Sequence, residues 1–203
     1  FEPHAGEKEY FVDKGAKRYQ QVYSIVEPRW QPSEHRTLRT SPFYDRQQDL
    51  GAEFYQSGGW EVPQWYDSNR DLVDEYDELI PEQDGWTGIN RSPIEAAEHL
   101  HTRDAVSMFD MTSFSSIMVE GPDATEFLQR VCSNDVDSAV GKVRYSLLLN
   151  EGGGILGDIT VVRLADDRYM LTTGGGSSPG IHGGWLEDHA PDTVSVQIQE
   201  GGK

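Results

Sequence analysis

Cysteine is nearly absent from this 203-residue chain, because Cys132 is its only one. An internal disulfide and a cysteine-based zinc site are therefore both excluded. Cys132 itself is interpreted as a small buried hydrophobic residue at a helix end. No apolar run approaches the length that spans a bilayer, and the chain begins with neither a methionine nor an apolar signal stretch. We expect an excised part of a larger cytoplasmic protein, without a membrane partner.

Basic residues are also few: 17 Lys and Arg stand against 35 Asp and Glu, giving a formal net charge of −18. A field of that sign repels phosphate backbones, which argues against a nucleic-acid partner. Low hydrophobicity with high charge is typical of disorder, but aromatic residues make up 10% of the chain and indicate a real core. An acidic, lysine-poor surface over an ordinary core predicts a salt-adapted, halophilic protein.

The first half of the chain is polar and predicts few regular elements. Apolar spacing favours one amphipathic helix over residues 8–26. Ser41 is a suitable N-cap for a short helix over 42–50, and Ser92 for a helix over 92–103. The acidic segment between them, residues 67–93, is interrupted by Pro and Gly and is expected to be a loop.

The second half alternates short apolar strands with two helices. The order of the elements indicates an α+β domain with a largely antiparallel sheet and flanking helices. The strands are predicted at 105–111, 115–121, 143–150, 155–164, 168–174 and 194–199, and the helices at 122–132 and 181–189.

Two glycine triplets, at 152–154 and 174–176, could cradle a phosphate. Neither has the dinucleotide-binding spacing, and no Gly-Lys-Ser/Thr follows either of them. The first triplet lies between two predicted strands, where glycine is the residue that tolerates a positive φ. We interpret it as a turn, while the second triplet precedes a helix and could hold an anion.

The histidines do not predict a metal site. His99 and His101 are two residues apart in a predicted helix, so they point to different faces. His182 and His189 are isolated in the sequence, and all four are interpreted as core or surface residues. A nucleophile-elbow motif for hydrolysis is also missing from the sequence.

Asp158 is the most informative single residue. It lies inside the apolar run ILGDITVV, where an unpaired carboxylate that faced the core would be costly. Strict alternation places it with Thr160 and Val162 on one face, opposite Ile159. That mixed face is expected either to face solvent or to form the wall of a pocket. Tyr145, on the preceding strand, could stack on a flat ligand there.

At these residues the sequence resembles a known family. RYSLLLNEGGGILGDITVVRL resembles the strand-turn-strand of the aminomethyltransferases, which include the glycine cleavage T protein. The segments LGAEFYQSGGWEVPQWY and MFDMTSFSSIMVEGPDATEFLQRVCSNDV are similar to the family's opening and strand-helix segments. The resemblance implies the N-terminal part of the aminomethyltransferase folate-binding fold.

The resemblance also implies a tetrahydrofolate site. Asp158 matches the acidic residue that lies beside the folate ring nitrogens and is essential for transfer. Tyr145 matches a residue that lines the same pocket, and Thr160 and Thr172 match positions that contact the folate. Phe114 stands where the T protein has a methionine that contacts the pterin.

Details of the resemblance favour fused dimethylglycine or sarcosine dehydrogenases or oxidases. Residues 1–40 resemble the linker arm from an upstream flavin domain, and 41–203 the start of the folate-binding domain. FAD would bind only in that upstream partner, which would oxidise a small N-methyl amine to an iminium whose carbon passes to tetrahydrofolate. Because later folate-contacting residues of the family lie beyond residue 203, the fragment alone is expected to be inactive. Two alternatives stay open: a glycine cleavage aminomethyltransferase and a non-catalytic folate-binding module.

Overall fold

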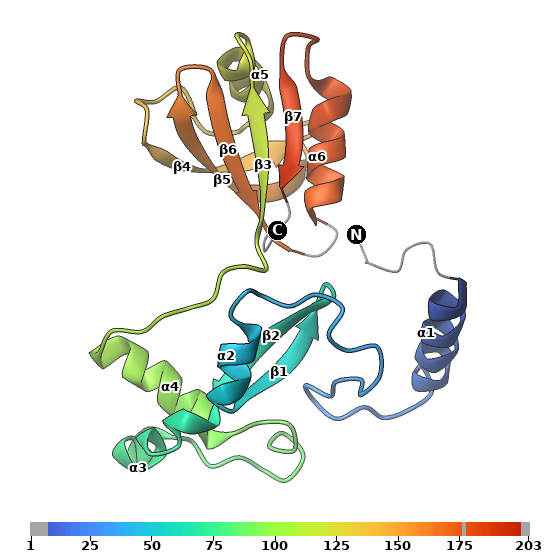
Figure 1. Cartoon of the computed structure of the whole chain (residues 1–203), viewed down its shortest axis with the longest axis vertical. Coiled ribbons are helices and arrows are strands. Elements are labelled where there is room, and N and C mark those ends of the chain that lie inside the picture. Colours follow the sequence, from blue (N-terminus) through green and yellow to red (C-terminus); the bar gives the residue numbers. More distant parts are fainter. Residues whose placement is uncertain (1–7, 176–177, 200–203) are drawn as a thin grey trace. The chain divides into compact units, whose positions relative to one another are not determined.

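A computed structural model describes residues 8–175 and 178–199 of the chain (Figure 1). The chain forms two compact units, an N-terminal unit that ends at Asp110 and a C-terminal unit that begins at Met111. Each unit has its own secondary structure and is described on its own.

The N-terminal unit is built around one β-hairpin with short helices. Its elements are α1 (Lys8–Gln21), α2 (Tyr44–Asp49), β1 (Ala52–Ser57), β2 (Trp60–Tyr66), a 3₁₀ turn (Asp67–Asn69), α3 (Leu72–Glu75), a second 3₁₀ turn (Asp77–Leu79) and α4 (Pro93–Asp104). The strands are antiparallel. The predicted cap at Ser92 is confirmed, because its Oγ accepts from the Ile94 amide at 3.2 Å. The predicted cap at Ser41 is wrong: α2 begins only at Tyr44 with Phe43 at the N-cap position, although Ser41 Oγ accepts from the Phe43 amide at 3.0 Å.

Three further expectations for this unit need correction. The first helix ends at Gln21 instead of residue 26. The β-branched residues Val22, Ile25 and Val26 lie after this end and are exposed. The segment 67–93 is not all loop, because it forms the two 3₁₀ turns and α3. The β1–β2 hairpin was not predicted, since its strands carry Glu, Gln and Pro at positions where an alternating apolar pattern would be the signal.

The segment before residue 41 lies against this hairpin. Arg39 forms a parallel bridge with Trp60, and the Glu61 amide donates to the Arg39 carbonyl at 2.9 Å. The Gln56 side-chain amide donates to the His35 carbonyl at 2.8 Å. Residues 35–39 therefore lie beside the hairpin and are hydrogen-bonded to it.

The C-terminal unit is a five-stranded sheet with two helices. Its elements are β3 (Ser115–Glu120), α5 (Ala124–Val131), β4 (Val143–Leu149), β5 (Ile155–Ala165), β6 (Arg168–Thr173), α6 (Ser178–His189) and β7 (Ser195–Gln199). The strand order is β4-β5-β6-β3-β7, and every neighbouring pair is antiparallel. The predicted α+β class with an antiparallel sheet and flanking helices is confirmed.

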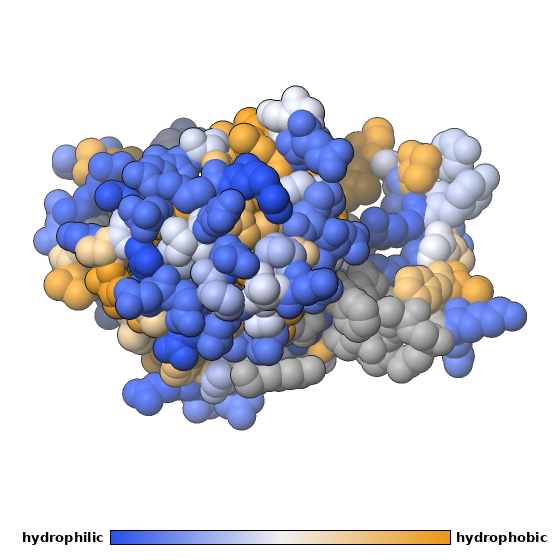
Figure 2. All heavy atoms as spheres, turned by 90° about the horizontal axis from the view of Figure 1, so that it is seen from above, coloured by the Kyte–Doolittle hydropathy of each residue, from blue (hydrophilic) through white to orange (hydrophobic). Residues whose placement is uncertain are grey.

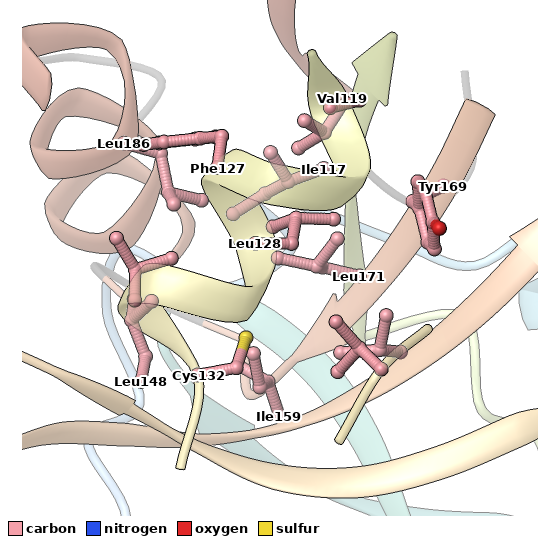
Figure 3. Packing of buried hydrophobic residues seen from close by; sticks show 14 of the residues in the cluster. Ile117, Val119, Phe127, Leu128, Cys132, Leu148, Ile159, Tyr169, Leu171 and Leu186 are labelled. Atoms are coloured by element: carbon pink, nitrogen blue, oxygen red, sulfur yellow. The ribbon is translucent and has the colours of Figure 1, made fainter. Parts of the chain in front are cut away.

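Both helices of this unit cover the same face of the sheet. Phe127 and Leu128 of α5 and Leu186 of α6 are buried together with inward residues of the strands, such as Ile159 and Leu171 (Figure 3). Burying each large apolar side chain contributes about 1.5–3 kcal/mol before conformational entropy is subtracted. The predicted apolar stripe of α5 is confirmed, and Cys132 at its end is buried as expected.

Two boundaries in this half differ from expectation. Residues 105–111 do not form a strand: no described strand pairs with them, and Val106 and Met108 are 99% and 97% exposed. Helix α6 begins at Ser178, three residues earlier than predicted. Pro179 therefore lies in its first turn, a position that suits proline.

The surface is strongly polar. Hydrophilic residues dominate the face seen in Figure 2, as the net charge of −18 leads one to expect. Within the part of the chain that the structure describes, no helix has the length and apolar character that crossing a bilayer requires.

Candidate functional site

Strand β5 separates core from candidate site by simple alternation. Ile159 and Val161 are 2% exposed and face the helices. Asp158, Thr160 and Val162 alternate with them in sequence and therefore point to the opposite side, which we call the open face. The predicted alternation is thus confirmed from Asp158 to Val162, but it is wrong at the start of the strand, where Ile155 is exposed and Leu156 packs against the core.

Strand pairing brings four of the five predicted site residues together on the open face. Tyr145 of β4 lies directly opposite Thr160, and Thr160 lies opposite Thr172 of β6. Asp158 is paired with Leu147, which lies two residues after Tyr145 in β4. Asp158 and Tyr145 are therefore diagonal neighbours on the same face. Such direct and diagonal neighbours are within reach of aromatic and long side chains.

The polar groups of this set have no partners in the part of the chain that the structure describes. Within residues 8–175 and 178–199, the Asp158 carboxylate and the hydroxyls of Tyr145, Thr160 and Thr172 make no hydrogen bond or ion pair. Asp158 is exposed, and Tyr145 is 60% exposed. On the helix-covered face, by contrast, the Thr173 hydroxyl bonds to a histidine. The open face therefore presents acceptors and donors that remain available to a ligand.

A row of apolar residues borders the polar row that Tyr145, Thr160 and Thr172 form across the sheet. Val162 pairs with Met170, which pairs in turn with Met118 of β3, and all three are partly exposed. A flat ligand that hydrogen-bonds to the polar row could rest its ring on these side chains.

Phe114, the fifth predicted residue, immediately precedes β3. Its amide donates to the Met111 carbonyl at 3.1 Å, so it belongs to a turn and not to the sheet ladder. The ring is 42% exposed. Strand pairing does not join Phe114 to the other four residues.

Behind Asp158, on the helix-covered face, the structure reveals a residue that sequence reasoning left without a role. The buried His182 of α6 lies against Gly157, where any side-chain carbon on residue 157 would overlap the imidazole ring. Its Nδ1 is 2.7 Å from the Thr173 hydroxyl, and its Nε2 is 3.2 Å from the Leu156 carbonyl. The available signal was the lone glycine inside an apolar strand, which marks a bulge or a close approach.

The first glycine triplet is a turn, as interpreted. The Asn150 side-chain oxygen accepts from the amides of Gly152 and Gly154 at 3.0 and 2.8 Å. Gly153 has φ +77°, which glycine adopts without strain. These amides are used within the loop and do not form a phosphate cradle. The second triplet lies partly outside the described residues, which resume at 178.

Two of the other histidines, His101 and His189, have local partners. His101 Nδ1 is 3.2 Å from the Tyr76 hydroxyl, and the His189 ring stacks on Trp185 with centroids 4.2 Å apart. No cluster of three or more His, Cys, Asp or Glu suited to a metal ion occurs where side chains are described.

Comparisons with known proteins identify the family of the chain. Residues 43–201 match the family model described as the GCVT N-terminal domain, and residues 1–41 match the FAD dependent oxidoreductase central domain. The glycine cleavage system aminomethyltransferase T from Bartonella henselae has a solved structure that superimposes with a TM-score of 0.62 at 32% identity. That likeness covers 81% of this chain and 39% of the other.

Two curated relatives are much longer than this chain. The 4-methylaminobutanoate oxidase (formaldehyde-forming) of Paenarthrobacter nicotinovorans is 30% identical over 173 residues, which are 85% of this chain and 20% of the relative. The mitochondrial pyruvate dehydrogenase phosphatase regulatory subunit of Mus musculus is 28% identical over 183 residues, which are 88% of this chain and 20% of the relative. The chain thus spans about a fifth of the length of these relatives.

Proposed function

The chain belongs to the GCVT N-terminal domain family, and from that membership we propose that it forms the folate-binding part of a one-carbon transferase. In the proposed parent enzyme, a flavin domain oxidises a small N-methyl amine, such as dimethylglycine or sarcosine, to an iminium. Residues 41–203 then bind the tetrahydrofolate whose nitrogen attacks the iminium carbon, which gives methylenetetrahydrofolate and releases the demethylated amine. Residues 1–40 connect the two parts.

One observation carries this proposal: the open face presents a carboxylate and three hydroxyls that have no partner among the described residues. A pteridine is flat and carries ring N–H donors along one edge. The Asp158 carboxylate is an acceptor suited to those donors, and the exposed Tyr145 ring suits stacking. Thr160 and Thr172 can both donate and accept. The residues present therefore fit the ligand that the family uses.

Each residue has a distinct role in this proposal. Tetrahydrofolate supplies the nucleophilic nitrogen for one-carbon transfer. Asp158 orients the ligand's ring edge, stabilises positive charge that develops beside it and can accept a proton. Tyr145 and the two threonines fix the ring, so that the reacting atoms meet in a productive geometry.

The match of residues 1–41 to a flavin oxidoreductase domain supports the fusion and favours it over a glycine cleavage aminomethyltransferase. The relative named 4-methylaminobutanoate oxidase supports a methylated amine as the substrate class. That name also includes formaldehyde formation, which would be the outcome if the carbon were not captured by folate. The partition between formaldehyde and methylenetetrahydrofolate is therefore the informative measurement.

The test is Asp158→Asn in the full-length parent protein. Amine oxidation should continue at the normal rate, while the yield of methylenetetrahydrofolate falls and formaldehyde rises to match. Asp188→Asn is the matched control, since it removes an exposed carboxylate of α6 that lies away from the open face. An unchanged methylenetetrahydrofolate yield in Asp158→Asn would falsify the role of this carboxylate.

The murine relative favours a second candidate, a non-catalytic module, because its name describes a regulatory subunit. Calorimetry of the unmodified parent protein with tetrahydrofolate, combined with an assay for methylenetetrahydrofolate, distinguishes the two. The transferase proposal requires both binding and a folate-dependent product. A regulatory module would give no product, whether or not folate binds.

A further inference from the structure

The backbone just before Asp158 departs from regular pairing. Leu148 of β4 is paired with Gly157, but the next residue, Leu149, is paired with Ile155, so Leu156 is passed over. The pairing of β5 with β6 begins only at Thr160 and does not reach this point. Strand β5 therefore carries a bulge two residues before Asp158. Bulges change the direction of side chains and are frequent beside active sites.

His182 replaces the missing strand partner at this bulge. Its Nε2 lies 3.2 Å from the Leu156 carbonyl, the group that β4 passes over. A carbonyl can only accept, so Nε2 carries the proton and donates it to this bond. Nδ1 of the neutral ring then accepts from the Thr173 hydroxyl, 2.7 Å away. Because His182 and Thr173 are 6% and 2% exposed, water does not compete freely for these bonds.

Gly157 makes this contact possible. Its missing side chain would point toward α6, and the imidazole ring occupies that space. The next residue, Asp158, points to the opposite face. His182 thus holds the backbone of Asp158 from behind, and α6, β5 and β6 are joined through one ring.

We propose that His182 is a positioning residue, which with Thr173 fixes the bulge at Leu156 and so sets the place of the Asp158 carboxylate on the open face. The proposal rests on the proposed function, because it assigns His182 to the same transfer reaction. His182 touches neither substrate nor folate in this role. It acts only through the Leu156–Gly157 backbone.

The experiment uses two pairs of variants in the full-length parent enzyme. His182→Leu removes both hydrogen bonds at similar volume, whereas the amide nitrogen of His182→Gln can still donate to Leu156. Thr173→Val removes the donor to Nδ1, and Thr173→Ser keeps it. Val119→Ala is the control for general loss of stability, because Val119 is a core residue of β3 paired with Tyr169, away from the bulge.

Displacing a reactive group by about 1 Å can cost on the order of 10²-fold in rate. We therefore expect His182→Leu to slow methylenetetrahydrofolate formation by about that factor in single turnovers. Amine oxidation should be unchanged, folate affinity should change much less than the transfer rate, and the lost carbon should appear as formaldehyde. Thr173→Val should act in the same direction, and His182→Gln and Thr173→Ser should recover most of the rate. Val119→Ala should lower only the unfolding temperature.

The possible failures are distinguishable. Normal transfer in folded His182→Leu and Thr173→Val, with transfer lost in Asp158→Asn, would overturn the positioning role and leave the proposed function intact. Normal transfer in Asp158→Asn would overturn the roles assigned to Asp158 and His182, while one-carbon transfer itself would stand. Absence of a folate-dependent product in the unmodified parent enzyme would overturn the proposed function. If His182→Leu does not fold, the Thr173 pair decides, because it changes the imidazole's partner while leaving the ring in place.

Discussion

Arg36 and Glu61 form a buried ion pair that fastens the segment before residue 41 to the β1–β2 hairpin. Arg36 Nε lies 2.8 Å from one carboxylate oxygen of Glu61, and its Nη2 bonds to the other. The Thr37 amide also donates to Glu61, at 2.7 Å. The Glu61 side chain is only 1% exposed, so these partners replace water almost completely.

This pair predicts an acid-sensitive N-terminal unit. Burial alone would raise the pKa of Glu61, but the Arg36 guanidinium and the Thr37 amide lower it overall from its ordinary value of 4.5. A lowered folded-state pKa stabilises the protein above pH 4.5, and that contribution disappears as the pH falls through the folded-state pKa.

Glu61→Gln should therefore lower the free energy of unfolding by about 2 kcal/mol at pH 7 and flatten its dependence on pH below 4.5. Urea unfolding at several pH values measures both effects. Asp67→Asn, in the exposed pair with Arg70, is the control and should change little. A similar loss of stability in both variants would show that burial of the Arg36–Glu61 pair has no special effect.

Cys132 should be unreactive while the protein is folded. Burial raises the pKa of its thiol from 9.0 to about 11, although Ser146 partly opposes this. Because the pKa of the thiol is higher by about two, about 100-fold less of it is present as thiolate, the species that attacks electrophiles. Iodoacetamide at pH 8 should modify the urea-unfolded chain quickly and the native chain very slowly, as mass spectrometry would show. Equal rates would mean that the thiol is accessible in the native protein.

Variants of Tyr145 distinguish the contribution of ring stacking from that of the hydroxyl hydrogen bond on the open face. In the parent protein, Tyr145→Ala should weaken tetrahydrofolate binding by roughly tenfold, which corresponds to the upper range of an aromatic contact. Tyr145→Phe keeps the ring and should lose less. Calorimetry gives both affinities, and the 60% exposure of the native ring makes a folding defect in either variant unexpected. Wild-type affinity in Tyr145→Ala would exclude stacking at this residue.

Salt should stabilise the chain. Its net charge of −18 causes self-repulsion, and the screening length shortens to about 3 Å at 1 M salt. The unfolding temperature should therefore rise between 0.1 and 2 M potassium chloride, concentrations that span about 10 Å to below 3 Å of screening. A variant with Asp166, Asp167, Glu187 and Asp188 changed to their amides should respond less. An unfolding temperature independent of salt would contradict the halophilic interpretation.

The C-terminal unit could be predicted well because its sequence pattern and its tertiary environment agree. From Asp158 to Val162, β5 alternates regularly, and the sheet buries one face of it under α5 and α6. In α5, the apolar residues recur at helical spacing, and Phe127 and Leu128 are buried. Local pattern was sufficient in both cases.

Prediction failed where stability comes from distant partners. Glu61 looks like a surface residue in sequence, but a partner 25 positions away makes its burial possible. Residues 105–111 have the composition of a strand, yet no strand pairs with them. At the site, alternation placed Asp158 and Thr160, whereas the function of His182 depends on a hydrogen bond across 26 residues that spacing cannot reveal.

The alternation of β5 has an evolutionary consequence. Ile159 and Val161 maintain the fold, while Asp158, Thr160 and Val162 contribute little to the core. Mutations at the second set can change ligand preference without unfolding the protein, so selection can act on specificity and on folding almost independently. A single strand with this division offers a simple route by which one scaffold could acquire different chemistries or lose catalysis altogether.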